Sequence, residues 1–600
     1  MNTTLLPTTA PLAIELSSKL EDGWKIETSV LEKEEANFKY RFTLTNDTPA
    51  MLKPLRLVWK LPAIGLRGVW KSNSLYNKRF QYDWELEHLQ SRVSTDAPVV
   101  CAYDHFDQNL ITFACSEVVE LVEMNALLRE EDNHLYCELN LFKEWKWGVD
   151  HYTFDLHVDL RKHQFSRALQ EVGEWWAGRP DLKPAQVPNL ARVPLYSTWY
   201  NYHQNLSEEE LIKEARLAVS MGLKLMIIDD GWQTKDSNRG YDFTGDWEPE
   251  RLTDMRGLVA DLHAVGMRVA LWYSVPFCGK KSKAYQHFRG KFLTEDHRWA
   301  PVFDPRYPEV RSYLINKYAK ALKEWDLDGF KLDFIDDFKV YPDTPLEQNE
   351  EQDYHSVNAA VDRLLTDIYA ALSTIKPEVV IEFRQQYIGP AVRKCGNMLR
   401  AFDCPGDAVT NRIRTTDVKL LCGTTAVHSD MITWHPEEPV EIAALQVTNI
   451  LFSVPQISVI LREIPLPYQR MITHYNQYWL TNRPILLDGE FIACDPLANY
   501  PILQASQGSK SIIGLYSDQV VRVAEPHVEV DIINSKPSMQ VFVQYSSGEA
   551  SYELEVLNCQ GEQVMKTTIV LSNQVCCIDV PAAGIIQLRK EEILEKGGPN

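Results

Sequence analysis

Two apolar runs of the sequence carry ionisable residues of the kinds that perform nucleophilic and acid–base chemistry. In Gly-Phe-Lys-Leu-Asp-Phe at 329–334, Lys331 and Asp333 are two residues apart and therefore share one face of a strand. A second run, residues 223–228, ends directly in Asp229 and Asp230. Because an ion buried on a strand costs desolvation free energy, these residues predict a polar site at the ends of two buried strands.

Three later strand-like runs of the central region also carry charged side chains at their ends: Glu382 and Arg384, Arg400 and Asp403, and His428 and Asp430. Each has a simpler structural explanation. An aspartate after a strand is often the N-cap of the next helix, Lys331 and Asp333 could form a structural ion pair, and His428 could be a satisfied rim histidine. A structural role is a sufficient explanation for any one of these charged strand ends. It is a poor explanation for charged ends on all five runs. We therefore expect the charged ends to converge on one site.

Several carboxylates with aromatic neighbours and no metal-ligand pattern suit glycoside hydrolysis, which uses one carboxylate as nucleophile or base and one carboxyl as acid. Trp199, Trp232 and Trp272 could supply apolar walls for sugar faces, although Trp272 could simply pack. The histidines and cysteines lack the spacing of a zinc site. We expect neither a metal nor an organic cofactor.

The elements that must position these residues alternate between strand and helix. Eight strand-like runs occur at 195–200, 223–232, 268–275, 329–335, 379–384, 397–403, 425–432 and 456–461. Helical patterns lie between most of them, including 207–221, with Ser207 and Glu210 as a capping box, and 308–325. Eight such units in about 300 residues predict a (β/α)₈ barrel, whose polar residues belong at the C-terminal rim. A doubly wound sheet would bring a glycine-rich phosphate loop, which this region lacks.

The 600 residues exceed what one hydrophobic core organises, so a multidomain α/β plus all-β protein is expected. Short alternating runs predict an N-terminal β-sandwich domain over residues 1–185 and a C-terminal β-domain over 504–600. The barrel occupies 190–503, after a proline-containing linker.

The formal net charge of −21 argues against nucleic acid or an anionic membrane as partner. No apolar stretch approaches the roughly 18 residues of a membrane span, and the first 20 residues lack a basic region and an apolar core, so no signal peptide is expected. Eleven cysteines without a regular framework favour reduced thiols and a cytoplasmic protein. Self-association is left open.

At this point the motifs resemble a known family. Asp-Asp-Gly-Trp at 229–232, Lys-x-Asp at 331–333 and the run from Arg400 to Asp403 resemble glycoside hydrolase family 36, the α-galactosidases, related to family 27 and to raffinose synthase-like proteins. The resemblance implies a β-supersandwich, a catalytic barrel and a small antiparallel β-domain. It also implies a small α-galactoside substrate, cleaved with retention of anomeric configuration.

Residue roles follow from the resemblance. Asp333 would be the nucleophile, and Lys331 would lower its pKa and contact sugar hydroxyls. Asp229 and Asp230 look like the pair that binds the 4- and 6-hydroxyls, while Trp199 and Trp232 would help to wall the pocket. Asp403 would be the general acid/base, with Arg400 oriented nearby. Asp407 is the alternative, but matching it to the family motif needs a one-residue insertion.

The sequence departs from the family after the fifth strand. Where many members have a cysteine- and glycine-rich loop near the sugar 2-hydroxyl, residues 382–393 read Glu-Phe-Arg-Gln-Gln-Tyr-Ile-Gly-Pro-Ala-Val-Arg. Arg384 could bind a hydroxyl, an acetamido oxygen or a carboxylate, or could pair with Glu382 or Asp403. An α-N-acetylgalactosaminidase and a transglycosylase resembling raffinose synthase therefore stay open beside the α-galactosidase. A non-catalytic carbohydrate-binding protein is the alternative from a different class.

Overall fold

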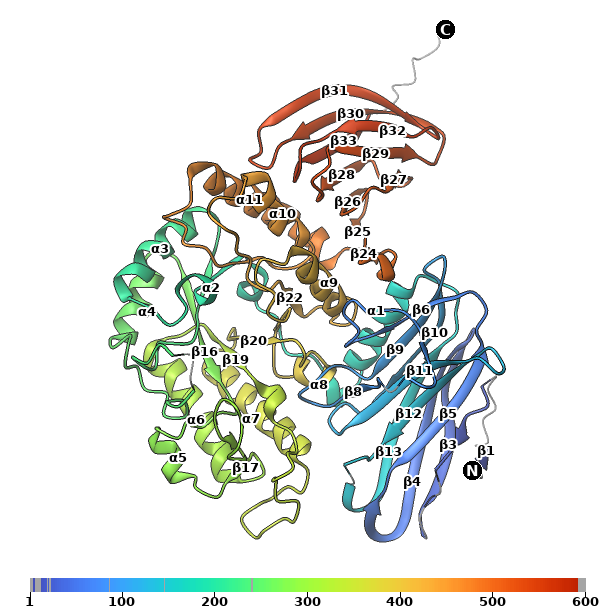
Figure 1. Ribbon diagram of the computed structural model, residues 1–600, viewed down its shortest axis with the longest axis vertical. Coiled ribbons are helices and arrows are strands. Elements are labelled where there is room, and N and C mark those ends of the chain that lie inside the picture. The colour runs from blue at the N-terminus through green and yellow to red at the C-terminus, as the bar shows by residue number, and fades with distance from the viewer. Residues whose placement is uncertain are drawn as a thin grey trace.

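Three structural units follow one another along the chain in the computed structural model (Figure 1). The model describes Thr4–Leu5, residues 12–18, residue 20, and residues 23–85, 87–144, 146–238 and 241–591. A β-sandwich comes first, a barrel with surrounding helices second, and a smaller β-domain last. The expected fold class is confirmed.

The N-terminal unit packs two sheets face to face around one core. Along β4, residues 37–45 alternate between buried and half-buried positions, with Phe38, Tyr40, Phe42 and Leu44 facing the core. This period of two is what a strand with one covered face requires. One sheet has the order β1 (Thr4–Leu5), β2 (Glu15–Leu16), β5 (Leu55–Pro62), β12 (His134–Leu141), β11 (Val122–Arg129) and β7 (Gln81–Tyr82), with β8 (Leu89–Ser91) also on β11. The other has the order β3 (Lys25–Glu34), β4 (Asn37–Leu52), β13 (Lys146–Asp159), β10 (Asn109–Cys115), β9 (Val99–Asp104) and β6 (Leu66–Lys71).

Parallel strands form the barrel of the central unit. In chain order they are β14 (Leu195–Ser197), β15 (Leu225–Ile228), β16 (Arg268–Ser274), β19 (Gly329–Asp333), β20 (Val380–Arg384), β21 (Met398–Arg400), β22 (Ala426–His428) and β23 (Gln456–Ile457). Each of the eight predicted runs contains one of these strands. β23 pairs with β14, and a parallel bridge between His428 and Val454 links the β22 edge to the segment before β23, which nearly closes the ring.

Helices surround the barrel, and β17 (Phe292–Thr294) with β18 (Val302–Phe303) forms a small hairpin beside it. On α6 the predicted face of Val310, Leu314 and Tyr318 is buried. The predicted capping box on α3 is wrong: Ser207 is the N-cap residue but makes no side-chain cap bond, and the Glu210 side chain pairs with Arg462 and Lys213. The helices are α2 (Trp199–Tyr202), α3 (Glu208–Ser220), α4 (Met255–Ala264), α5 (Lys283–His287), α6 (Pro308–Trp325), α7 (Val357–Ile375), α8 (Pro390–Arg393), α9 (Ala408–Lys419), α10 (Val440–Asn449) and α11 (Leu466–Asp488).

The C-terminal unit is mostly antiparallel, but β26 pairs with β28 and β27 with β29 in parallel. Its larger sheet has the order β24 (Glu490–Ala493), β25 (Ile502–Gln507), β26 (Lys510–Leu515), β28 (Glu529–Asn534), β33 (Ile585–Lys590), β30 (Glu549–Leu557) and β31 (Gln563–Ser572). The smaller has the order β27 (Val520–Val523), β29 (Gln540–Tyr545) and β32 (Cys576–Asp579). Because β24 pairs with β25, this sheet begins before residue 504, the start expected from the sequence.

A buried aspartate joins all three units. Asp417 on α9 accepts hydrogen bonds from Trp70 Nε1 of the sandwich (2.9 Å) and from the Tyr500 hydroxyl beyond β24 (2.5 Å). Its other oxygen pairs with Lys78 Nζ of the sandwich at 3.0 Å, and both side chains are almost fully buried. The N-terminal unit is therefore fixed to the barrel by a charge pair that excludes water.

Replacing Lys78 by methionine is expected to lower the stability of the whole protein by about 3–5 kcal/mol, because Asp417 is left as a buried charge without its cation. Thermal unfolding measures the effect. The matched control is Lys60→Met, which removes the exposed pair of Lys60 with Asp132 and should leave the melting temperature nearly unchanged. Equal shifts in the two variants would contradict the junction role of Lys78.

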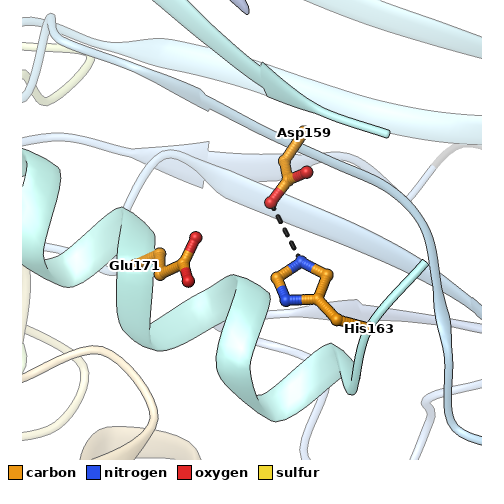
Figure 2. A group of neighbouring side chains, drawn as sticks. All are labelled: Asp159, His163 and Glu171. Atoms are coloured by element: carbon orange, nitrogen blue, oxygen red, sulfur yellow. Dashed lines mark hydrogen bonds and ion pairs between the residues drawn. The ribbon is translucent and has the colours of Figure 1, made fainter. Parts of the chain in front are cut away.

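A second polar group lies where the sandwich meets α1 (Phe165–Ala177). Figure 2 shows Asp159 and His163 joined by a hydrogen bond, with Glu171 of α1 nearby. These are metal-ligating residue types within reach of one another. However, Arg161 donates to both carboxylates, and this pairing, with the bond from His163, holds the pKa of buried Asp159 below its usual value against the opposing effect of burial. We assign the group a structural role, since a guanidinium already neutralises it.

Among the described residues, no helix combines the length and apolarity that crossing a membrane demands.

Candidate active site

The carboxylate of Asp333 lies at the C-terminal end of β19 and accepts an unusual number of hydrogen bonds. Its Oδ1 accepts from Arg384 Nε (2.6 Å), the Phe334 amide (2.7 Å) and the Tyr387 hydroxyl (2.9 Å). Its Oδ2 accepts from Trp272 Nε1 at 3.1 Å, and Lys331 Nζ lies 3.9 Å away. Oδ1 thus accepts three hydrogen bonds, whereas Oδ2 accepts one.

These partners keep Asp333 ionised. Burial by itself raises the pKa of this carboxyl, but the charges of Arg384, Lys331 and Arg400 outweigh burial and hold its pKa far below the ordinary value. A carboxylate that stays charged in a buried strand end is suited to act as a nucleophile.

The adjacent acidic pair sits at the end of β15. Lys331 Nζ donates to Asp229 Oδ2 at 2.7 Å, so the lysine lies between Asp229 and Asp333. Asp230 accepts from Gln204 and Gln233, at 2.8 and 2.6 Å. Burial, reinforced by the charge of Asp229, raises the pKa of Asp230 to about 6. The structure therefore brings these two aspartates into the same charged cluster as the strand β19 pair.

Arg400, fully buried on β21, gathers the acidic groups of the next strands. It donates to Asp403 Oδ1 at 2.9 Å and to Asp430 Oδ1, and its Nε lies 3.4 Å from Glu382 Oε1. Asp403 is the accessible member, since 42% of its side chain is exposed. Burial raises the pKa of Asp403, but the charges of Arg400 and Lys331 lower it by more, so the net shift is downward. Burial raises the pKa of Asp430 to about 6.

Asp407 has a structural task. It is the N-cap of α9, and its carboxylate accepts from the Thr410 amide at 2.9 Å and from the Thr410 hydroxyl at 2.5 Å. The geometry therefore does not support its alternative role as acid/base. It matches the simpler N-cap explanation instead.

The tryptophans divide between the site and the core. Trp272 donates to Asp333, so it touches the candidate nucleophile directly. Trp232 has no exposed surface; it donates to the Trp272 carbonyl and packs against Trp247 and Trp325. This position supports packing behind the site rather than the expected contact with substrate. Trp199, at the start of α2, is partly exposed and can form a wall.

The main partner of Arg384 is Asp333, and not Glu382 or Asp403. Besides Asp333, it donates to the Gln385 carbonyl at 2.8 Å, and its Nη2 lies 3.6 Å from Asp336 Oδ1. Its guanidinium also lies 4.7 Å from the ring centroid of Phe402. The departure after strand 5 thus places a cation on the candidate nucleophile itself.

His428 is the satisfied histidine that the simpler explanation expected. Its Nε2 lies 2.8 Å from the Ala191 carbonyl and its Nδ1 lies 3.3 Å from Gln456 Nε2. Burial lowers its pKa to about 3. A neutral, fully bonded imidazole is a structural part of the barrel.

Three tyrosines beside the charged cluster were not predicted as site residues. Tyr387 donates to Asp333, Tyr200 donates to Asp430 at 2.9 Å, and Tyr241 packs against Trp272 and Phe334. Tyr387 follows the unusual Arg384–Gln385 stretch, and Tyr200 follows Trp199. Their closeness in the sequence to predicted site residues is the signal that could have identified them. Nothing in the sequence around Tyr241 distinguishes it, because it lies in a long loop between β15 and α4.

Known proteins that this chain resembles in sequence include alpha-galactosidases. A family model described as Melibiase matches residues 181–386, which include Asp229, Asp230, Lys331, Asp333 and Arg384 but not Asp403. The chain is 24% identical over 173 residues to a probable alpha-galactosidase G of Emericella nidulans, covering 26% of this chain and 24% of that protein. It is 27% identical over 156 residues to alpha-galactosidase AgaA of Geobacillus stearothermophilus, covering 23% and 21%. The matched segments span about a quarter of the length of those relatives or less.

Solved structures match over almost the whole chain. A family 36 alpha-galactosidase AgaA of Geobacillus stearothermophilus, in complex with 1-deoxygalactonojirimycin, has a TM-score of 0.66 at 13% identity, covering 98% of this chain and 85% of that one. An alpha-galactosidase from Lactobacillus brevis has a TM-score of 0.65 at 12% identity, covering 100% and 88%.

The barrel with its two flanking β-domains has the fold of solved family 36 alpha-galactosidases, and the Melibiase model matches the segment that carries most of the charged cluster. More narrowly, the resemblance to glycoside hydrolase family 36 seen in the sequence motifs is confirmed.

Proposed function

We propose that this chain is a retaining glycoside hydrolase that removes terminal α-linked galactose from galactosides and oligosaccharides. The observation that carries the proposal is the state of Asp333: ionised, with Oδ1 held by three donors and Oδ2 left with one. A carboxylate oriented in this way presents Oδ2 to an anomeric carbon placed at the barrel mouth.

In the first step Asp333 Oδ2 attacks the anomeric carbon, the glycosidic C–O bond breaks, and Asp403 gives its proton to the leaving oxygen. In the second step Asp403 takes a proton from water, whose oxygen attacks the same carbon and releases Asp333. Asp403 suits the second role because it is the accessible carboxylate of its cluster.

The charges around Asp403 favour this alternation. Asp333 is among the groups that raise the pKa of Asp403, while Arg400 and Lys331 lower it. A sugar that covers the exposed part of Asp403 removes water and raises its pKa, which favours the acid form in the first step. Once Asp333 is esterified, its negative charge is gone, the pKa of Asp403 falls and the base form is favoured for the second step.

Galactose is the sugar that the acidic pair suits. Asp229 and Asp230 offer carboxylate oxygens beside Lys331, a combination that can accept from and donate to the 4- and 6-hydroxyls. Structures of AgaA variants contain raffinose and stachyose, and we extend that substrate class, α-galactosyl oligosaccharides, to this chain. Arg384 is occupied by Asp333 and Gln385, which favours galactose over its 2-acetamido derivative.

All eleven cysteines lie among the described residues and are free. This supports a reducing compartment, and we propose the cytoplasm.

The test is a panel of nitrophenyl α-glycosides: galactoside, N-acetylgalactosaminide, glucoside and galacturonide. We expect turnover of the galactoside alone, with release of α-galactose before mutarotation. Preference for the acetamido or the acidic sugar would mean that Arg384 resets specificity. Transfer to added sugar in place of hydrolysis would indicate the transglycosylase, and inertness toward every substrate would contradict an enzyme.

A further inference from the structure

The proposed reaction removes the negative charge to which Arg384 is bound. In the free enzyme Arg384 Nε donates to Asp333 Oδ1 at 2.6 Å, and both side chains are buried. When Asp333 Oδ2 bonds to the anomeric carbon, the carboxylate becomes a neutral ester. A buried cation that loses its anion is strongly unfavourable, so the galactosyl-enzyme needs a second negative charge beside Arg384.

The other two cations near Asp333 keep an anion throughout the reaction. Lys331 donates to Asp229 at 2.7 Å, and Arg400 donates to Asp430. Neither of these carboxylates is esterified in the proposed mechanism. The need for a second anion therefore falls on Arg384 alone among the three cations.

Three aromatic rings enclose the Arg384 guanidinium. Their centroids lie 5.2 Å away for Phe334, 5.3 Å for Tyr387 and 4.7 Å for Phe402. The face of an aromatic ring attracts a cation but carries no net charge. With 6% of its side chain exposed, Arg384 has little contact with water, so the protein itself must supply the anion.

Asp336 is placed to supply it. Its Oδ1 lies 3.6 Å from Arg384 Nη2, and among the residues that the structure describes only Asp333 and Asp336 bring a carboxylate within 4.0 Å of this guanidinium. The Asp336 Oδ1 atom is buried and accepts no hydrogen bond from those residues. A hydrogen bond of about 2.9 Å requires the two atoms to approach by only about 0.7 Å. Asp336 can therefore take over the guanidinium after a small movement.

A turn directly after β19 brings Asp336 to this position. Phe334, the residue after the strand, has a φ of +64°, and Asp336 lies in the short 3-10 helix Ile335–Asp337. The strand β20, which carries Arg384, pairs with β19 (Figure 1). A left-handed backbone is strained for a side chain as large as phenylalanine, and such strain is typical of functional sites. The turn thus sets Asp336 beside a side chain of the neighbouring strand.

We propose that Asp336 is a positioning residue that acts through Arg384, as the counter-ion that holds the guanidinium in place while Asp333 is esterified. The inference rests on the proposed function and adds a role for a residue to which the family resemblance assigns none. While Asp333 is free, Asp336 shares the cation and leaves the nucleophile more basic. Once Asp333 has reacted, Asp336 balances the whole charge of Arg384.

Asp336 must be ionised to act in this way. Burial raises its pKa to about 6, and the charge of Arg384 opposes that rise. Assays at about pH 7.5 therefore keep the carboxylate charged. The titratable and charged groups that face Asp336 are Asp333, Asp337 and Tyr341 on its own segment, Arg384 and Tyr387 on the segment that begins with β20, and Asp96 of the sandwich.

The experiment uses 5-fluoro-α-galactosyl fluoride, which separates the two chemical steps. Asp333 Oδ2 forms the new C–O bond, the C–F bond breaks, and fluoride leaves as an anion without a proton from Asp403. The fluorine at carbon 5 destabilises the oxocarbenium-like transition states, so the glycosyl-enzyme accumulates. Mass spectrometry of the intact protein measures its formation. Recovery of activity after removal of the reagent measures its hydrolysis.

For Asp336→Asn we expect labelling to be about tenfold slower than in the wild type or more, because Arg384 binds Asp333 more tightly and loses its anion as the ester forms. Hydrolysis of the ester returns the carboxylate to Arg384, so reactivation should be as fast as in the wild type or faster. Asp336→Ser is made in parallel, so that the test does not depend on the folding of one variant. Melting temperatures establish that each variant is folded.

Two controls accompany these variants. Asp337→Asn removes the neighbouring carboxylate, which pairs with His297 and Lys339, and should leave both rates within about threefold of the wild type. In an Arg384→Met background, Asp336→Asn should change the labelling rate by less than about threefold, because the two residues act through one contact.

The outcomes separate the two proposals. Folded Asp336→Asn and Asp336→Ser variants that are labelled within about twofold of the wild-type rate would overturn the role of Asp336 and leave the α-galactosidase intact. Equal slowing of labelling and reactivation, or a full effect of Asp336→Asn in the Arg384→Met background, would overturn it as well. A wild type that forms no labelled enzyme and releases no fluoride from α-galactosyl fluoride would overturn the proposed function, and the role of Asp336 with it.

Discussion

Replacing Asp333 by alanine is expected to lower kcat/KM for an α-galactoside by about 10⁴-fold or more, since the covalent step loses its nucleophile. Steady-state assays with the nitrophenyl galactoside measure the loss. The sharper measurement adds azide. With the carboxylate gone, azide can enter the vacated space and attack directly, and the product should be β-galactosyl azide, with inverted configuration.

The alanine variant also leaves Arg384 and Lys331 without their shared carboxylate, so instability could imitate a catalytic loss. Asp333→Asn is the matched control, because it keeps the shape and an oxygen for the three donors on Oδ1. We expect Asp333→Asn to melt near the wild type and to be as inactive as the alanine variant. Activity of either folded variant within tenfold of the wild type would remove Asp333 from the nucleophile role.

Asp403→Ala is expected to slow hydrolysis of sugar leaving groups by about 10²–10⁴-fold, the usual contribution of a general acid. Activated aryl galactosides need little protonation, so their first step should survive and the galactosyl-enzyme should accumulate. Azide needs no general base and should restore turnover. In this variant it attacks the covalent intermediate, so the product should be α-galactosyl azide, the opposite anomer from the Asp333 variant.

Asp407→Ala is the companion to this experiment. It removes the N-cap of α9 and should cost about 1 kcal/mol of stability, with activity and leaving-group dependence close to the wild type. Azide rescue in Asp407→Ala but not in Asp403→Ala would move the acid/base role to Asp407.

Much of the fold was predictable because its signals are local. The eight barrel strands are apolar runs buried on both faces, and their polar residues fall at the C-terminal ends where a barrel places its site. The face of α6 follows from helical spacing alone. The start of the C-terminal sheet was harder, since only pairing with β25 makes the short β24 part of that unit.

The candidate site was predictable as a set of residues but not as a set of contacts. Lys331 and Asp333 share a strand face by periodicity, and this follows from sequence alone. That Arg384 pairs with Asp333, rather than with Glu382 or Asp403, depends on the path of the loop after β20. From the sequence Trp232 was the expected wall and Trp272 could simply pack, yet Trp272 donates to Asp333 and Trp232 is buried behind it.

The sequence by itself determined the barrel, the acidic pair, the Lys-x-Asp strand and the family resemblance, because strand periodicity and motif spacing can be read directly from the order of residues. Tertiary structure decided which carboxylates stay charged, since Arg384 and Arg400 reach Asp333 from β20 and β21, and Lys331 reaches Asp403 from β19. It also decided that Asp96, from a loop of the sandwich, and Arg414 of α9 line the same interdomain cavity. The two residues are far apart in the chain, and only packing of one unit against another brings them together.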